Sequence, residues 1–146
     1  MSFNIQEHSS LKPKPSTTSD LQYAVELQQI AAKQSFEWLD IKPVFEKLFE
    51  EIDELKAEII KKDKGIDAEK QAEKIQDELG DVLFCCVNLA RFLKIDPEKA
   101  LAGTNDKFRR RFQFIEERLY QDGLSVKDSS LEVLDQIWDQ AKEEGL

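Results

Sequence analysis

Two pairs of carboxylates are the residues of this chain with the clearest potential for chemistry. Glu51 and Glu54 stand three positions apart in one acidic stretch, and Glu78 and Asp81 stand three apart in another. Residues three apart on a helix share a face, so each pair would present both carboxylates together. Acids that converge beside a core repel one another and resist desolvation. A hard divalent cation with oxygen ligands relieves both costs, and beside phosphates this is usually Mg²⁺.

The acid pairs must be positioned by helices. The 146 residues are 35% charged and 40% hydrophobic, with only 5 glycines and 4 prolines, a composition typical of helical proteins. Apolar positions recur at helical spacing in five segments, and no strand pattern or repeat is evident. The helices are expected at about residues 20–36, 40–61, 67–94, 96–120 and 129–144. We expect Asp20, Asp40 and Asp96 to cap the first, second and fourth of them.

The second and third helices are expected to form an antiparallel hairpin, because the link between them is short. This hairpin would bring the two acid pairs face to face. The third helix is apolar on nearly every face over residues 82–93, apart from a polar stripe formed by Glu78, Asp81, Cys85 and Asn88. A helix that is apolar all round must be buried all round. Five helices in one small chain can hardly cover it, so we expect at least a dimer.

Charge and composition exclude several classes of protein. The net charge of −9 disfavours general binding to nucleic acid or anionic membranes. No apolar run approaches the roughly 20 residues of a membrane span, and the N-terminus lacks a signal-peptide pattern. Cys85 and Cys86 are adjacent and poorly placed for a disulfide, which fits a reducing cytoplasm. Residues 1–19 are polar and are expected to be a disordered tail before one domain over 20–146.

The sequence resembles the MazG family of nucleoside triphosphate pyrophosphohydrolases. The family signature EExxE followed by ExxD is matched by Glu50, Glu51, Glu54, Glu78 and Asp81. The stretches 78–91 and 105–112 also look typical of the family. The likeness runs from about residue 20 to the C-terminus and is closest to the catalytic C-terminal domain of two-domain members. EExxE alone is common on acidic helices, but both acid motifs followed by the Lys/Arg stretch form a specific combination.

The resemblance implies an all-α, five-helix MazG-like bundle that dimerises, in some members as a dimer of dimers. It implies hydrolysis of an NTP or dNTP to the monophosphate and pyrophosphate, dependent on Mg²⁺ or alternatively Mn²⁺, with nucleotide-pool housecleaning as the role. The metal ligands implied are Glu51, Glu54, Glu78 and Asp81. The phosphate-contacting residues implied are Lys74, Lys107 and Arg111, and a family Trp and Lys are matched by Trp138 and Lys142.

Some side chains remain open to two interpretations. Glu50, beside the first acid pair, is the candidate to orient or deprotonate a water. Asn88 is either a contact to a sugar or base or a satisfied core amide. Lys74 either contacts phosphate or pairs with Glu78 one turn away. The aromatic rings of Trp38 and Trp138 either stack on a base or are plain core.

Three other functions are weighed against the general pyrophosphohydrolase. A di-iron carboxylate bundle also uses acid pairs on antiparallel helices, but it needs two Glu-x-x-His motifs, and the single histidine, His8, cannot supply them. An acidic helical interaction module without catalysis would leave the ordered acid and basic motifs unexplained. A more specialised dUTP or dCTP pyrophosphatase would share every motif, so the preferred base and sugar stay open.

Overall fold

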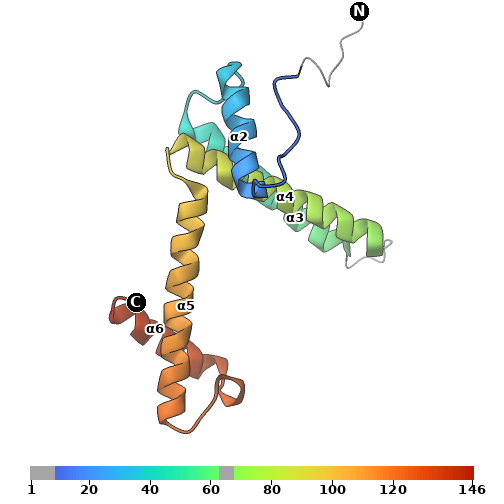
Figure 1. Cartoon of the computed structure of the whole chain (residues 1–146). Coiled ribbons are helices and arrows are strands. Elements are labelled where there is room, and N and C mark those ends of the chain that lie inside the picture. The colour runs from blue at the N-terminus through green and yellow to red at the C-terminus, as the bar shows by residue number, and fades with distance from the viewer. Residues whose placement is uncertain (1–8, 63–67) are drawn as a thin grey trace, which may run out of the picture. The chain divides into compact units, whose positions relative to one another are not determined.

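The computed structural model describes residues 9–62 and 68–146, and the regular structure in these ranges is entirely helical (Figure 1). The helices are α2 Asp20–Lys33, α3 Ile41–Lys62, α4 Ala68–Phe92, α5 Pro97–Gln121, the short 3₁₀ helix η1 Val126–Asp128 and α6 Leu131–Glu143. The all-α class is therefore confirmed. His8, the fraying expected at 63–65 and the helix start expected at residue 67 lie outside the described residues.

The chain divides into two compact units, Met1–Pro97 and Glu98–Leu146. In the first unit α3 and α4 pack along each other as a hairpin, and α2 packs on α4 (Figure 1). The hairpin expected from the short link is thus present. Val44 on α3 and Val87 on α4 are buried, and the side-chain amide of the buried Gln28 donates to the Phe84 carbonyl at 2.9 Å, joining α2 to α4.

Several helix ends differ from the sequence expectation for local reasons. Ser19, not Asp20, caps α2, since its hydroxyl accepts from the Gln22 amide at 3.1 Å. The helix α2 ends at Lys33 rather than near residue 36, because Ser35 adopts a left-handed φ of 65°. The helix α4 ends at residue 92, and Lys94 has a φ of 59°. Left-handed residues commonly follow the last helical turn.

Other helix starts follow sequence chemistry more closely. The Asp40 carboxylate accepts from the amide of the next residue, Ile41, at 2.6 Å at the start of α3, whereas a capping side chain ordinarily accepts from the amide two or three positions on. Pro97 is the first residue of α5, where its missing N–H costs nothing. The last helix starts two residues later than expected, at Leu131, since the Ser130 hydroxyl accepts from the Val133 amide at 3.4 Å.

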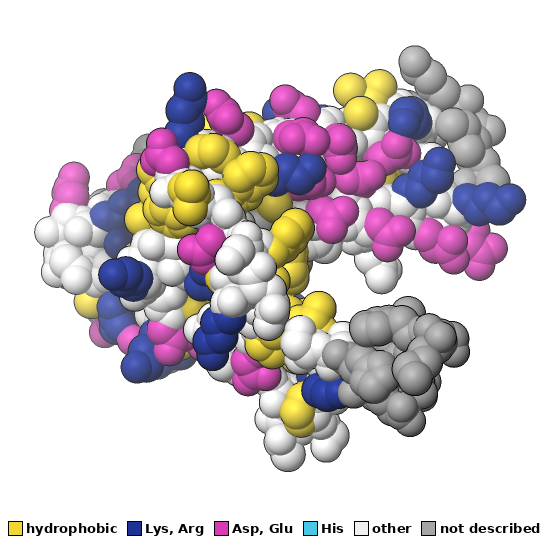
Figure 2. All heavy atoms as spheres, turned by 90° about the horizontal axis from the view of Figure 1, so that it is seen from above, with side chains coloured by type: hydrophobic (Ala, Val, Ile, Leu, Met, Phe, Trp, Pro, Cys, Tyr) yellow, Lys and Arg dark blue, Asp and Glu magenta, His cyan; other side chains and the backbone are white. Residues whose placement is uncertain are grey.

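The apolar half of α4 is only partly covered by the other helices of the first unit. Leu83 and Phe84 are 57% and 43% exposed, although Val87 on the same helix is buried. Figure 2 shows hydrophobic side chains at the surface beside acidic ones. The all-round burial that the sequence demands is therefore not supplied by α2 and α3.

The described part of the N-terminal segment, residues 9–19, contains no helix. The Tyr23 hydroxyl donates to the Lys12 carbonyl at 2.6 Å, and the Lys14 ammonium pairs with Asp20 at 2.6 Å. These contacts hold residues 12–14 beside the start of α2, while the disorder expected for residues 1–19 stays a prediction. No helix within the described ranges has the length and apolar character needed to cross a membrane.

Candidate active site

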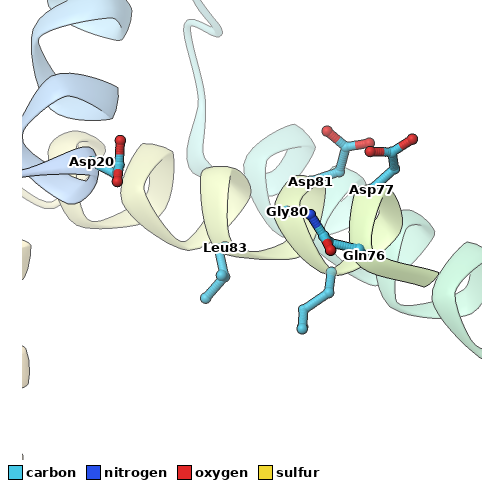
Figure 3. Close-up of a pocket in the computed structure, with 7 residues that line it drawn as sticks. Asp20, Gln76, Asp77, Gly80, Asp81 and Leu83 are labelled. Carbon is cyan, nitrogen blue, oxygen red and sulfur yellow. The ribbon is translucent and has the colours of Figure 1, made fainter. Parts of the chain in front are cut away.

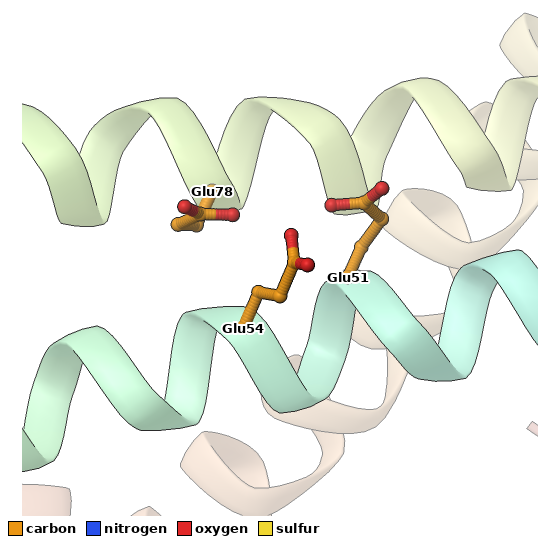
Figure 4. Close-up of side chains that lie close together, drawn as sticks. All are labelled: Glu51, Glu54 and Glu78. Atoms are coloured by element: carbon orange, nitrogen blue, oxygen red, sulfur yellow. The ribbon is translucent and has the colours of Figure 1, made fainter.

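Three carboxylates converge between the two helices of the hairpin. Glu51 and Glu54 extend from α3 and Glu78 from α4, and one carboxylate oxygen of each lies within 4.8 Å of the others (Figure 4). Glu51 and Glu54 share a face because they are three residues apart, and the antiparallel packing of α4 brings Glu78 opposite them. An oxygen-only donor set of this kind fits a hard cation such as Mg²⁺ or Mn²⁺.

The three acids differ in their exposure to solvent. Glu51 is buried, Glu78 is half-buried and Glu54 is exposed. The pKa of Glu78 lies above its usual range, chiefly because of desolvation, with further contributions from the charges of Glu54 and Asp81. The group therefore carries an excess of negative charge in a partly desolvated place. A bound cation would remove that excess.

Lys47 adds a positive charge to the acid group that is not among the residues expected from the sequence. Its ammonium lies 2.6 Å from a Glu51 carboxylate oxygen and 3.0 Å from a Glu50 oxygen, one helical turn away on α3. The hydrogen bond to Glu51 is the largest cause of a raised pKa of Lys47, and the hydrogen bond to Glu50 is the next largest. The spacings of four and three residues could have revealed this contact, because such residues are neighbours on a helix.

Asp81, the fourth ligand expected, lies outside the group of three carboxylates. It is exposed and, with Asp77, Gly80 and Leu83, lines an open pocket of about 840 Å³ (Figure 3). Figure 3 shows the carboxylates of Asp77 and Asp81 on the same side of α4. Asp81 is three residues from Glu78, the same step that separates Glu54 from Glu51, so spacing alone does not decide which acids meet across the hairpin. Its charge still reaches the site, and its role as a ligand stays a prediction.

The basic residue Lys74 is exposed on α4. The pKa of Glu58 is lowered chiefly by a hydrogen bond from Lys61 and then by one from Gln71. The charge of Lys74 lowers this pKa further. Glu58 follows Glu54 by one turn on α3, so Lys74 acts on an acid next to the cluster. Its expected phosphate contact remains untested.

Asn88 and Trp38 are placed differently from the three acids. The Asn88 side-chain oxygen accepts from the Arg91 guanidinium at 3.0 Å, and the same guanidinium pairs with Glu37 at 2.9 Å. The Asn88 oxygen is thus engaged along α4, and both interpretations of this side chain stay predictions. Trp38 lies between α2 and α3 and is 48% exposed, so the core interpretation does not fit it.

The second unit contains the downstream residues expected to contact substrate. The Arg111 guanidinium lies over the Trp138 ring, 5.4 Å from its centre, and its Nε donates to the Leu146 carbonyl at 2.7 Å. The Phe108 ring packs on Trp138 with a centroid separation of 5.3 Å. Arg111 on α5 and Trp138 on α6 therefore form one contact group.

The two expected lysines of this unit lie on the same helices. Lys107 is exposed and precedes Arg111 by one turn of α5. Lys142 follows Trp138 by one turn of α6, and its ammonium pairs with Asp139 at 2.8 Å. The neighbouring Arg110 pairs with Asp106 within α5.

A family profile matches the part of the chain that contains this helical hairpin. The profile described as MazG nucleotide pyrophosphohydrolase domain matches residues 40–114, which contain the three clustered acids as well as Asp81, Lys107 and Arg111. This match covers just over half of the chain. The chain belongs to the MazG family.

Sequence similarity to individual proteins supports the same family assignment. The Thermotoga maritima protein named nucleoside triphosphate pyrophosphohydrolase/pyrophosphatase MazG is 38% identical over 122 residues, 84% of this chain and 44% of its own. The Escherichia coli K12 nucleoside triphosphate pyrophosphohydrolase is 36% identical over 136 residues, 93% of this chain and 49% of its own. A Bacillus subtilis protein designated YabN is 55% identical over 69 residues, 47% of this chain and 14% of its own. The chain thus spans less than half the length of these relatives.

Proposed function

We propose that this chain hydrolyses nucleoside triphosphates, NTPs or dNTPs, to the monophosphate and pyrophosphate. The observation that carries the proposal is the convergence of Glu51, Glu54 and Glu78 across the α3–α4 hairpin of a MazG-family chain. The names of the Thermotoga and Escherichia relatives support the same reaction. We assign to it the cytoplasmic role of cleansing the nucleotide pool.

The acid group would hold the metal ion. Glu51, Glu54, Glu78 and, from the neighbouring face, Asp81 would be the ligands, with Mg²⁺ as the physiological ion and Mn²⁺ as the alternative. When bound, the ion supplies charge neutralisation on the phosphate oxygens and lowers the pKa of a coordinated water. The burial of Glu51 and the raised pKa of Glu78 support this assignment. Both carboxylates have reduced access to water, so a bound cation would stabilise their negative charge.

The remaining steps are assigned to side chains of this chain. Basic residues hold the triphosphate so that the bond between the α and β phosphates is aligned for attack. Glu50, exposed beside the metal group, accepts a proton from the attacking water, whose oxygen forms the new bond to phosphorus as the anhydride bond breaks. The phosphate contacts are assigned to Lys74, Lys107 and Arg111. The nucleoside contacts are assigned to Asn88, Trp138 and Lys142.

The working unit is proposed to be a homodimer, or a dimer of such dimers. The exposed Leu83 and Phe84 on α4 support this, since a second copy would cover them. The nucleotide is the proposed substrate partner, and neither nucleic acid nor membrane is required.

The decisive experiment measures pyrophosphate release from a panel of NTPs and dNTPs with Mg²⁺, with Mn²⁺ and with EDTA. We expect release that requires the metal ion, and products of nucleoside monophosphate and pyrophosphate rather than diphosphate and phosphate. Glu51→Gln should abolish it, whereas Glu46→Gln, an exposed acid on the same helix, should not. Turnover confined to dUTP or dCTP would favour the specialised pyrophosphatase. Failure to turn over any nucleotide would favour the acidic interaction module.

A further inference from the structure

The Lys47 ammonium occupies a position at the metal group that the proposed reaction does not use. It lies 2.6 Å from Oε1 of Glu51, the buried member of the acid group, whose side chain is only 7% exposed. Lys47 itself is 41% exposed, so its charge reaches inward from the edge of the site. A carboxylate with so little contact to water requires a partner, because an unpaired buried charge is strongly destabilising.

The same ammonium has a second partner outside the buried group. Glu50, whose side chain is 57% exposed, lies 3.0 Å from Lys47 by its Oε1 atom. Contact with Glu51 can therefore be given up without leaving the ammonium unpaired. The long, flexible lysine stem permits such a change of partner, which a shorter side chain would not.

We propose that Lys47 is the resident counter-cation of Glu51 in the metal-free protein and that it competes with the divalent cation for this carboxylate. This inference rests on the proposed metal site and adds a determinant of its affinity. A lysine ammonium and a divalent cation on one carboxylate repel each other, so cation binding must displace the ammonium or be weakened by it. Lys47 thus stabilises the protein before metal binds and lowers its affinity for metal.

The test compares Mg²⁺ binding to the full chain by isothermal titration calorimetry, without nucleotide. Lys47→Met should bind Mg²⁺ more tightly, by about tenfold, equivalent to about 1.4 kcal/mol. Lys47→Arg retains the charge and should show no such gain. The matched control is Lys56→Met, which removes the same charge from α3 where Lys56 pairs with the exposed Asp53 at 2.9 Å.

Thermal unfolding provides a second measurement. If Lys47 only packed against its neighbours, its replacement would not change the rise in melting temperature that Mg²⁺ causes. In EDTA, Lys47→Met should melt below the wild type, because Glu51 loses its counter-charge, and Mg²⁺ should raise its melting temperature by more than it raises that of the wild type. Lys47→Gln, which keeps a hydrogen-bond donor for Glu51, serves as the second variant if the methionine variant folds poorly. It should also bind Mg²⁺ more tightly.

The outcomes separate this inference from the proposed function. If the wild type binds Mg²⁺ and hydrolyses nucleotide, but neither uncharged Lys47 variant binds more tightly, the competition is refuted while the function stands. An equal gain in Lys56→Met would also refute it, by showing that net charge alone sets the affinity. If the wild type binds no Mg²⁺, both the metal site and the role of Lys47 are refuted.

Discussion

The side-chain nitrogen of Gln71 on α4 donates to two oxygens of Glu58 on α3, the main-chain carbonyl and the carboxylate Oε2, each at 2.8 Å. Gln71 is 1% exposed and Glu58 is 9% exposed, so the contact is shielded from water. Glu58 follows Glu54 by one turn, which places this contact just beyond the acid group. It therefore joins α3 to α4 beside the site that the hairpin must hold in register.

Replacing Gln71 by alanine should lower the free energy of unfolding by about 1–3 kcal/mol, since the Glu58 oxygens would lose a buried donor. Urea unfolding followed by circular dichroism measures the change. Gln76→Ala, on the same helix but exposed, is the control and should have little effect. Equal stability of the two variants would show that the buried contact contributes nothing beyond helix propensity.

The helices and the acid group were predictable because they depend on local spacing. A separation of three residues fixes the common face of Glu51 and Glu54, and the short link fixes the partner helix that carries Glu78. The resemblance to a family added roles that spacing does not provide. It did not determine that Asp81 would lie outside the group of three, since rotation around α4 depends on packing.

The errors at helix ends have a different origin. Ser35 and Lys94 have left-handed φ values without being glycine, so no residue type announced the ends of α2 and α4. The sequence also could not show that Ser19 rather than Asp20 caps α2, because both residue types cap helices well. These positions depend on the surrounding packing, which the pattern of apolar residues does not specify.

The replacement Asp81→Asn should reduce turnover at least about 100-fold while leaving the fold intact. Even partners that only orient metal ligands are worth roughly 10–100-fold, and a lost ligand should cost no less. Pyrophosphate release and far-UV circular dichroism give the two measurements. Asp77→Asn is the matched control, since Asp77 lines the same pocket one turn earlier. Activity of Asp81→Asn at the wild-type level would remove Asp81 from the metal site.

In EDTA at neutral pH, Glu78→Gln should melt above the wild type. The folded protein raises the pKa of Glu78 above its unfolded value, chiefly by desolvation, so ionised Glu78 destabilises the fold. The advantage of the variant should vanish as the pH falls below the unfolded pKa, about 4.3, where Glu78 is protonated in both states.

Addition of Mg²⁺ should reverse this order of stability. A cation that binds only the folded form stabilises by mass action, by about 2.7 kcal/mol at a free concentration of 100 times its Kd. The wild type should therefore gain more than Glu78→Gln in melting scans at fixed ionic strength. Glu73→Gln, exposed on α4, is the control. Absence of any shift in the wild type at millimolar Mg²⁺ would argue against a preformed site.

Removal of the Lys107 charge should slow catalysis, because the proposed contact with the phosphates of the substrate is lost. Lys107→Gln should lower kcat/KM by about 10–100-fold, because a hydrogen bond to a charged group contributes about 1.5–3 kcal/mol. Arg110→Gln is the control, since Arg110 pairs with Asp106 within α5. Steady-state kinetics with the preferred nucleotide measures kcat/KM for both variants. An equal loss of kcat/KM in both would indicate only a general effect of charge.

The exposed apolar face of α4 predicts a dimer in solution. Leu83 is 57% exposed on a helix whose apolar half extends over most of its circumference, and a second copy of the chain would bury it. Multi-angle light scattering should therefore give a mass of at least twice 16.9 kDa for the wild type at micromolar concentration. Leu83→Glu should shift the protein toward the monomer without loss of helix content.

Leu39 provides the matched control for that shift. It is 99% exposed between α2 and α3, so Leu39→Glu introduces the same charge without affecting the α4 face. We expect Leu39→Glu to keep the mass of the wild type. An active wild-type species of 16.9 kDa would refute the dimer itself, whereas a dimer unaffected by Leu83→Glu would place the interface elsewhere.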